Sequence, residues 1–132
     1  MKLGTVTFFA RDVDALAGFY TAALGLSPTV DDPPRYREVG AGGANIGFAA
    51  QAAYQTLCLE DEANPTGLRN ILTFALPDAN GMTDAVLRAV GCGAAVVRSP
   101  YSTHFGSMMA VLRDPEGNVF RLNAPLNADR PA

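Results

Sequence analysis

Two residues of this sequence could do acid–base or anion-binding chemistry. The chain has a single histidine, His104, within the segment 100–106. A loop histidine can act as an acid, a base or a hydrogen-bond donor, or it can simply be solvated or cap a turn. Arg121 can clamp an acidic or carbonyl group of a ligand, form an internal ion pair, for example with Glu38, or extend into solvent. If the protein is an enzyme, His104 and Arg121 are the candidate catalytic residues.

The sequence does not indicate other common chemistries. The serines lack a G-x-S-x-G context, and the segment 40–43 matches no phosphate-binding loop. Cys58 and Cys92 lack CxxC spacing, so we expect reduced thiols. The 10 basic and 13 acidic residues give a net charge of −3, with the basic residues scattered. We therefore expect no nucleic-acid partner, because binding phosphates requires clustered Lys and Arg.

Length and hydropathy define the broad class. With 132 residues, of which 48% are hydrophobic, the chain predicts a single folded domain over 1–132. The first residues lead directly into strand-like sequence, without an apolar signal core. No stretch of about 18 apolar residues is present. We therefore expect a cytoplasmic protein that does not interact with membranes.

An internal repeat organises the chain. Segments 5–25 and 71–91 align without a gap at a constant offset of 66 residues. Matching positions include Thr7 with Thr73, Phe8 with Phe74, Asp12 with Asp78, Leu16 with Met82, Ala23 with Ala89 and Gly25 with Gly91. Helix caps and apolar positions match together, which indicates a duplicated module and not a many-unit solenoid.

Each copy reads as one strand, one helix and three further strands. Asp12 and Asp78 are predicted to cap the helices, and Gly25 and Gly91 to end them in the left-handed conformation. The expected strands lie near 6–10, 29–30, 35–39 and 44–49, and near 72–76, 94–99, 107–113 and 118–123. The predicted fold class is therefore α+β, with two βαβββ modules at about 3–50 and 70–124. The linker 51–69 has room for one extra strand at 55–59.

Strand alternation predicts which side chains line a concave surface. Facing the helices are Phe8, Phe74, Phe120 and Leu122; facing the concave side are Thr5, Thr7, Phe9, Ile71, Thr73, Ala75, Val119, Arg121 and Asn123. Such a cavity is mostly apolar, with hydroxyls, one amide and one guanidinium. Tyr101 and Phe105 either stack on a ligand or seal the rim. The pattern suits a small, flat, apolar ligand with an acidic or carbonyl group.

Three motifs, in order, carry a family resemblance. They are Arg11-Asp12, then Phe19-Tyr20 followed by Leu24-Gly25-Leu26, and finally Asp114-Pro115-Glu116-Gly117-Asn118. With the paired modules, this pattern over about residues 3–124 resembles the vicinal oxygen chelate superfamily of glyoxalases, bleomycin-resistance proteins and extradiol dioxygenases. The resemblance implies a glyoxalase-like pair of half-barrels, and homodimers are common in that superfamily.

The resemblance also locates the positions at which metal-using relatives hold a divalent ion. Carried onto this chain they are Thr5, Gly47, Ile71 and Arg121, with the register least certain at Gly47. Ile and Gly have no donor side chain, Thr is a weak ligand, and Arg is cationic. We therefore expect no metal or other cofactor. The alternative is a divalent metal ion held by carboxylates elsewhere.

The leading functional hypothesis is metal-independent binding of a small, largely apolar molecule, as in antibiotic or metabolite sequestration by a bleomycin-resistance-like homodimer. The alternative is a glyoxalase-like lyase or isomerase, or a dioxygenase. It would have an atypical metal site or use acid–base chemistry at His104 and Arg121. A third possibility is a structural or regulatory dimer with a vestigial cavity.

Overall fold

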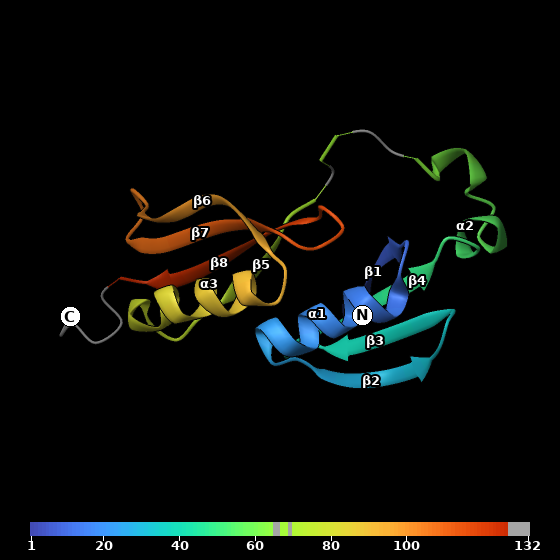
Figure 1. Ribbon diagram of the computed structural model, residues 1–132, viewed down its shortest axis with the longest axis horizontal. Helices are drawn as coiled ribbons and strands as arrows, with labels where there is room; N and C mark the ends of the chain where they lie inside the picture. The colour runs from blue at the N-terminus through green and yellow to red at the C-terminus, as the bar shows by residue number, and fades with distance from the viewer. Residues whose placement is uncertain (65–66, 69, 127–132) are drawn as a thin grey trace. The chain divides into compact units, whose positions relative to one another are not determined.

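The computed structural model describes residues 1–64, 67, 68 and 70–126 and divides into two compact units, Met1–Gly67 and Leu68–Ala132. Each unit contains one βαβββ module (Figure 1). The α+β fold class predicted from the repeat is confirmed. Within the described residues, no helix is both long and apolar enough to span a membrane.

The first unit is a four-stranded mixed sheet with one long helix. Its elements are β1 (Thr5–Ala10), α1 (Val13–Leu24), β2 (Ser27–Asp32), β3 (Tyr36–Gly40) and β4 (Asn45–Ala50). The strand order is β1-β4-β3-β2, with β1 parallel to β4 and the other pairs antiparallel. The chain therefore returns from β4 to the edge where it started.

The second unit repeats this connectivity. Its elements are β5 (Leu72–Ala75), the 3₁₀ turn η2 (Ala79–Gly81), α3 (Met82–Gly91), β6 (Ala95–Ser102), β7 (Ser107–Arg113) and β8 (Val119–Pro125). The order β5-β8-β7-β6 is the same as in the first sheet, again with one parallel pair, β5 with β8. The sequence repeat is thus a repeat of topology.

The helix of the first unit begins and ends as predicted. The Asp12 carboxylate accepts a hydrogen bond of 3.0 Å from the Ala15 backbone N–H, which would otherwise be unpaired at the helix start. Gly25 has φ 69° and its N–H donates to the Thr21 carbonyl. Gly is favoured at this position because it adopts the left-handed conformation without steric cost.

The second module differs at both helix ends. Asp78 caps the 3₁₀ turn η2 instead, accepting from the Asn80 N–H at 2.9 Å, and α3 starts only at Met82. The prediction that Gly91 ends the helix in the left-handed conformation is wrong. Gly91 is the last helical residue, and the positive φ of 112° occurs at Gly93. The 3₁₀ turn shifts the start of the helix along the chain, and Gly93, not Gly91, has the positive φ after the helix.

The extra strand expected at 55–59 is not present. The region forms a short helix, α2 (Ala53–Thr56), followed by the 3₁₀ turn η1 (Glu60–Glu62). The Leu57 N–H donates to the Ala53 carbonyl at 3.0 Å, which closes a helical turn. Local hydrogen bonds therefore satisfy this backbone without a neighbouring strand.

Each helix packs on one face of its own sheet. In the first unit α1 packs on β3 and β4, and in the second α3 packs on β6, β7 and β8. The predicted helix-facing residues Phe8, Phe120 and Leu122 are buried there. Phe74 is half-buried, with its ring 6.0 Å from that of Phe120. We call the opposite face of each sheet its open face: the first open face belongs to β1–β4 and the second to β5–β8.

Candidate functional site

A carboxylate lies at the centre of the first open face. Glu38, on β3, accepts hydrogen bonds from side chains of all four strands of the sheet. The donors are Thr5 Oγ1 at 3.3 Å, Thr29 Oγ1 at 2.9 Å, Tyr36 Oη at 2.8 Å and Asn45 Nδ2 at 2.9 Å. A carboxylate offers about four acceptor positions. The four neutral donors therefore use the acceptor capacity of Glu38.

Tyr36 lies over Gly47 on the same face. A Cβ atom added at Gly47 would fall 2.9 Å from Tyr36 Cζ and closer still to the hydroxyl oxygen. Gly47 pairs with Thr7, and in the second sheet Arg121 pairs with Thr73, the repeat mate of Thr7. Gly47 and Arg121 therefore occupy equivalent positions in the two modules, as the resemblance implies. The space that a ligating side chain would need at Gly47 is filled by the tyrosine.

The pKa values of Tyr36 and Glu38 shift in opposite directions. Burial, followed by the hydrogen bond to Glu38, raises the pKa of Tyr36 to about 12, since ionisation would place two negative charges side by side. The hydrogen bond from Tyr36 is the largest influence that lowers the pKa of Glu38, with further contributions from Thr29, Asn45 and Thr5. At neutral pH the face therefore holds a carboxylate and a neutral phenol.

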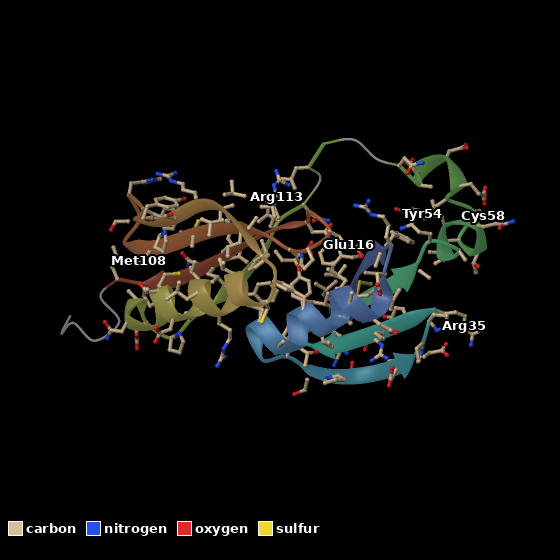
Figure 2. All side chains as sticks on the ribbon, viewed as in Figure 1. Arg35, Tyr54, Cys58, Met108, Arg113 and Glu116 are labelled. Atoms are coloured by element: carbon tan, nitrogen blue, oxygen red, sulfur yellow. The ribbon has the colours of Figure 1, made fainter. Side chains whose placement is uncertain are left out.

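An aromatic pair lies at the end of β1. The ring of Phe9 stacks on that of Tyr54 from α2, with centroids 3.9 Å apart and planes inclined by 18°. Figure 2 labels Tyr54 on the segment that follows β4. Thr5, Thr7 and Phe9 alternate with helix-facing residues, as predicted, so they belong to one face. The face is nonetheless more polar than predicted, because of Glu38 and Asn45.

Arg121 lies on the second open face. Its Nε donates to Thr73 Oγ1 at 3.0 Å, and its Nη1 lies 4.0 Å from Met109 Sδ. Two residues along the same strand, the Oδ1 atom of Asn123 is buried without a hydrogen-bond partner among the described residues. The structure thus brings together three predicted site residues, Thr73, Arg121 and Asn123, and adds Met109.

Tyr101 borders the same cluster. Its hydroxyl donates to Met109 Sδ at 3.4 Å, and the guanidinium carbon of Arg98 lies 3.4 Å from the centroid of its ring. Such a cation–π contact positions both side chains. Tyr101 is therefore joined to Arg121 through the Met109 sulfur, while Arg98 adds a second cation beside the ring.

The remaining predicted site residues lie outside this network. His104 and Phe105 are exposed neighbours in the turn before β7, with their rings edge to face at 5.2 Å. No hydrogen bond or ring contact joins His104 to Arg121. Ile71 is 38% exposed and precedes β5. Their roles in binding or catalysis stay predictions.

The donor set does not fit a metal ion at the positions carried from the resemblance. Thr5 already contacts Glu38, Gly47 is covered by Tyr36, and Arg121 is a cation. Across 1–64, 67, 68 and 70–126, no group of three or more His, Cys, Asp or Glu side chains could hold a metal ion. We therefore derive no chemistry that depends on a metal.

One hollow of about 210 Å³ lies between α1 and the strands β2 and β3. It is smaller than the usual range for small-molecule sites. Arg37, in its lining, pairs with Asp14 at 2.6 Å and with Asp31 at 3.2 Å. Because Arg37 pairs with carboxylates and Glu38, also in the lining, accepts hydrogen bonds from four side chains, the hollow has little left with which to recognise a ligand.

Sequence reasoning identified the arginine, the threonines and the asparagine but not the importance of Tyr36, Glu38 and Asn45. A usable signal was present: Tyr36 and Glu38 alternate with Val39, which is buried against the helix. Assigning the face of β3 from Val39 would have placed both polar residues on the open face. Their partners could not be assigned without the strand register.

Comparison with known proteins identifies a family with this architecture. The glyoxalase-like domain profile matches residues 5–123. A solved glyoxalase/bleomycin resistance protein/dioxygenase family enzyme from Burkholderia phytofirmans PsJN is 32% identical, with a TM-score of 0.92, covering 96% of this chain and 100% of that one.

More distant structures share the fold. A glyoxalase/bleomycin resistance protein/dioxygenase from Nocardioides is 18% identical, with a TM-score of 0.79 over 100% of this chain and 88% of that one. A lactoylglutathione lyase from Agrobacterium tumefaciens is 17% identical, with a TM-score of 0.72 over 92% of each chain. No curated protein matches the sequence.

Proposed function

Since the chain belongs to the glyoxalase-like domain family, we propose that it binds a small, largely apolar molecule without the help of a metal ion. The ligand class is an antibiotic or metabolite that the protein sequesters. The candidate binding surfaces are the open face of the first sheet and the open face of the second sheet, each taken by itself. The fold alone does not specify an activity, so the proposal depends on the side chains of these faces.

The placement of Tyr36 over Gly47 is the observation that carries this proposal. A ligating His or Glu at position 47 would collide with the phenol ring, whose Cζ lies 2.9 Å from the Cβ position. The adjacent carboxylate, Glu38, accepts hydrogen bonds from four protein donors. A metal ion would have to displace these donors, and it would find no second carboxylate or imidazole in the cluster.

The second open face supports the same proposal, because its charged residue is a cation and not a carboxylate. Arg121 occupies the register position that matches Gly47 in the first module. A guanidinium repels a divalent cation and attracts an acidic or carbonyl group. Next to it are the half-buried Tyr101 and, beneath its hydroxyl, the buried Met109, which are apolar and polarisable. These properties favour an organic ligand over a metal.

We extend the proposal to a homodimer as the binding form. Each sheet has two edge strands, β1 and β2 or β5 and β6, that can pair with further chain. Dimers with a two-fold axis are the commonest oligomers of soluble proteins. Light scattering coupled to size exclusion should give twice the chain mass of 13.8 kDa. A mass of one chain at micromolar concentration would contradict the dimer.

Metal content is the decisive test of the metal-independent function. Untagged protein should contain no stoichiometric metal, and Mn²⁺, Ni²⁺ or Zn²⁺ should leave its Tm unchanged. A screen of acidic aromatic compounds and cationic antibiotics should yield a ligand that binds equally well with a chelator present. Stoichiometric metal, with a rise in Tm that a chelator reverses, would overturn the proposal and favour a metal-dependent lyase or dioxygenase.

A further inference from the structure

We infer that the second open face recognises an organic acid that also carries a hydrogen-bond donor on the far side of a flat apolar body. Arg121 takes the acid, and the Asn123 amide oxygen takes the donor. This inference rests on the proposed small-molecule function and specifies the chemistry of its ligand.

Arg121 supplies the group that binds the acid. The side chain is half-buried, and its partners within the described residues are the neutral Thr73 Oγ1 and Met109 Sδ. Arg37, on the first sheet, instead pairs with two carboxylates, Asp14 and Asp31. A cation partly removed from water is stabilised by an anion. Arg121 therefore retains N–H donors and an uncompensated charge for an acidic group of a ligand.

Asn123 supplies the group that accepts the hydrogen bond from the ligand. Its Oδ1 atom is buried and accepts no hydrogen bond in the part of the chain that the structure describes. Buried polar atoms in folded proteins almost always have a partner, so this oxygen calls for a donor. Asn123 is two residues from Arg121 on β8 and on the same face. Since a strand rises about 3.3 Å per residue, the α-carbons of the two residues are spaced by about 6–7 Å.

The surface between these groups is apolar. In the sheet register Met109 is opposite Asn123, and Val111 is opposite Arg121. Tyr101 is opposite Met109 on the other side and contacts its sulfur. Sulfur and aromatic surfaces favour contact with a flat ring. The arrangement matches one ring with an acid at one end and an N–H or O–H group at the other.

The sign of the charge follows from comparing the two open faces. Glu38, the carboxylate of the first open face, already accepts four hydrogen bonds, so a cationic ligand finds no free acceptor on it. On the second open face Arg98, stacked on Tyr101, adds positive charge near Arg121. The charge available to a ligand on the second open face is therefore positive, although the net charge of the chain is −3.

Four matched probes test this inference by calorimetry or by protein-observed NMR. The probes are 4-hydroxybenzoate, which has both groups; benzoate, which lacks the donor; 4-methoxybenzoate, in which the donor is methylated; and 4-hydroxybenzamide, in which the acid is neutral. We expect 4-hydroxybenzoate to bind about 3–10-fold more tightly than benzoate or 4-methoxybenzoate, the range for one neutral hydrogen bond. The benzamide should bind at least about 10-fold more weakly, because a charged hydrogen bond is lost.

Variants assign each contact to its residue. Asn123→Leu should abolish the advantage of 4-hydroxybenzoate over benzoate, and Arg121→Gln should abolish the advantage of the acid over the amide. Arg121→Lys retains the charge and provides a second test if Arg121→Gln unfolds. The matched control is Arg88→Gln, which removes the same charge from an exposed position of α3, on the other side of the sheet. Its probe affinities should not change.

Equal affinities of 4-hydroxybenzoate and benzoate, or an advantage that survives Asn123→Leu, would overturn this inference. Failure of all four probes would also overturn it. Neither result decides the broader proposal, because metal-independent binding of a different ligand in the screen above would still stand. Conversely, tight metal binding with no ligand in that screen would overturn the broader proposal.

Discussion

The hydroxyl of Tyr36 lies over the α-carbon of Gly47 and donates a hydrogen bond of 2.8 Å to Glu38. This relationship places the Tyr36 side chain of β3 over the backbone of β4 at Gly47, the position that the resemblance matches to a metal ligand of metal-using relatives. It makes position 47 dependent on the residue at position 36. Several expected properties of the protein follow from this contact and from the hydrogen-bonded groups near it.

Substitution of Gly47 tests the contact directly. Gly47→Ala should lower the free energy of unfolding by about 1–3 kcal/mol, as expected for overpacking, because the new methyl group meets the Tyr36 ring. In a Tyr36→Ala background the same change should cost less, since the ring is gone. Urea denaturation of the four proteins in this cycle measures the coupling.

The matched control is Gly43→Ala. A Cβ atom there meets nothing within 4 Å, so its effect should stay below about 0.5 kcal/mol. Equal costs of Gly47→Ala with and without the Tyr36 ring would show that the ring does not restrict position 47.

The raised pKa of Tyr36 predicts a late tyrosine titration. Tyr36 should ionise near pH 12, and the absorbance change near that pH should be smaller in Tyr36→Phe than in the wild type. The folded state binds this proton more tightly than the unfolded chain, whose pKa is near 10. Its stabilising contribution is therefore complete below about pH 10 and is lost as pH rises through about 12. An absorbance change near pH 12 that is equally large in Tyr36→Phe and in the wild type would contradict the assignment.

The lowered pKa of Glu38 predicts the opposite behaviour in acid. Glu38→Gln should destabilise the protein at neutral pH, because an amide replaces an acceptor of four hydrogen bonds and directs N–H groups at some of the donors. The ionised Glu38 contributes stability above its unfolded pKa of about 4.5, and that contribution is lost as pH falls.

The difference in stability between the wild type and Glu38→Gln should therefore shrink below about pH 4.5. Denaturation curves from pH 3 to pH 7 measure it, with the exposed Glu60→Gln as control. A difference that stays constant over this range would exclude a stabilising role for the carboxylate charge.

The turn before β8 depends on Asp114. This buried carboxylate accepts hydrogen bonds from the Glu116 N–H, the Asn118 N–H and the Asn118 side-chain amide, at 2.9–3.0 Å. Asp114→Ala should cost about 2–3 kcal/mol of unfolding free energy, because donors lose a charged acceptor. Asp114→Asn keeps one acceptor oxygen and should cost less. Denaturation of both variants, against the exposed Asp61→Ala, is the measurement; a neutral Asp114→Ala would show that water replaces the carboxylate without cost.

Local signals predicted the elements well where they act within a few residues. Asp12 and Gly25 bound α1 as predicted because each contacts the backbone of its own helix. Asp78 and Gly91 do not bound α3 as predicted, because Asp78 caps the 3₁₀ turn η2 and Gly91 is still helical. A 3₁₀ turn inserted at Ala79–Gly81 shifts the helix, and sequence spacing alone does not distinguish a 3₁₀ turn from the first turn of an α-helix.

For the site, the sequence predicted which side of the sheet each side chain lies on, but not which residues it contacts. Alternation placed Thr73, Arg121 and Asn123 on one side of the second sheet, and the pairing of β5 with β8 bears this out. The partners of Arg121 were left open between a ligand, an ion pair and solvent. Within the second unit its side chain contacts Thr73, 48 residues away along the chain. A contact over that separation depends on strand register, which periodicity does not report.

The sequence by itself determined the two βαβββ modules, the α+β class and the family, because hydrophobic periodicity, helix caps and the repeat are all encoded locally. Only the tertiary structure decided that Glu38 accepts from Thr5, Thr29 and Asn45, at sequence separations of 33, 9 and 7 residues. It also decided that Tyr36 covers Gly47. The physical reason is that side chains on different strands meet according to strand order and register. Both are set by the packing of the whole sheet against its helix.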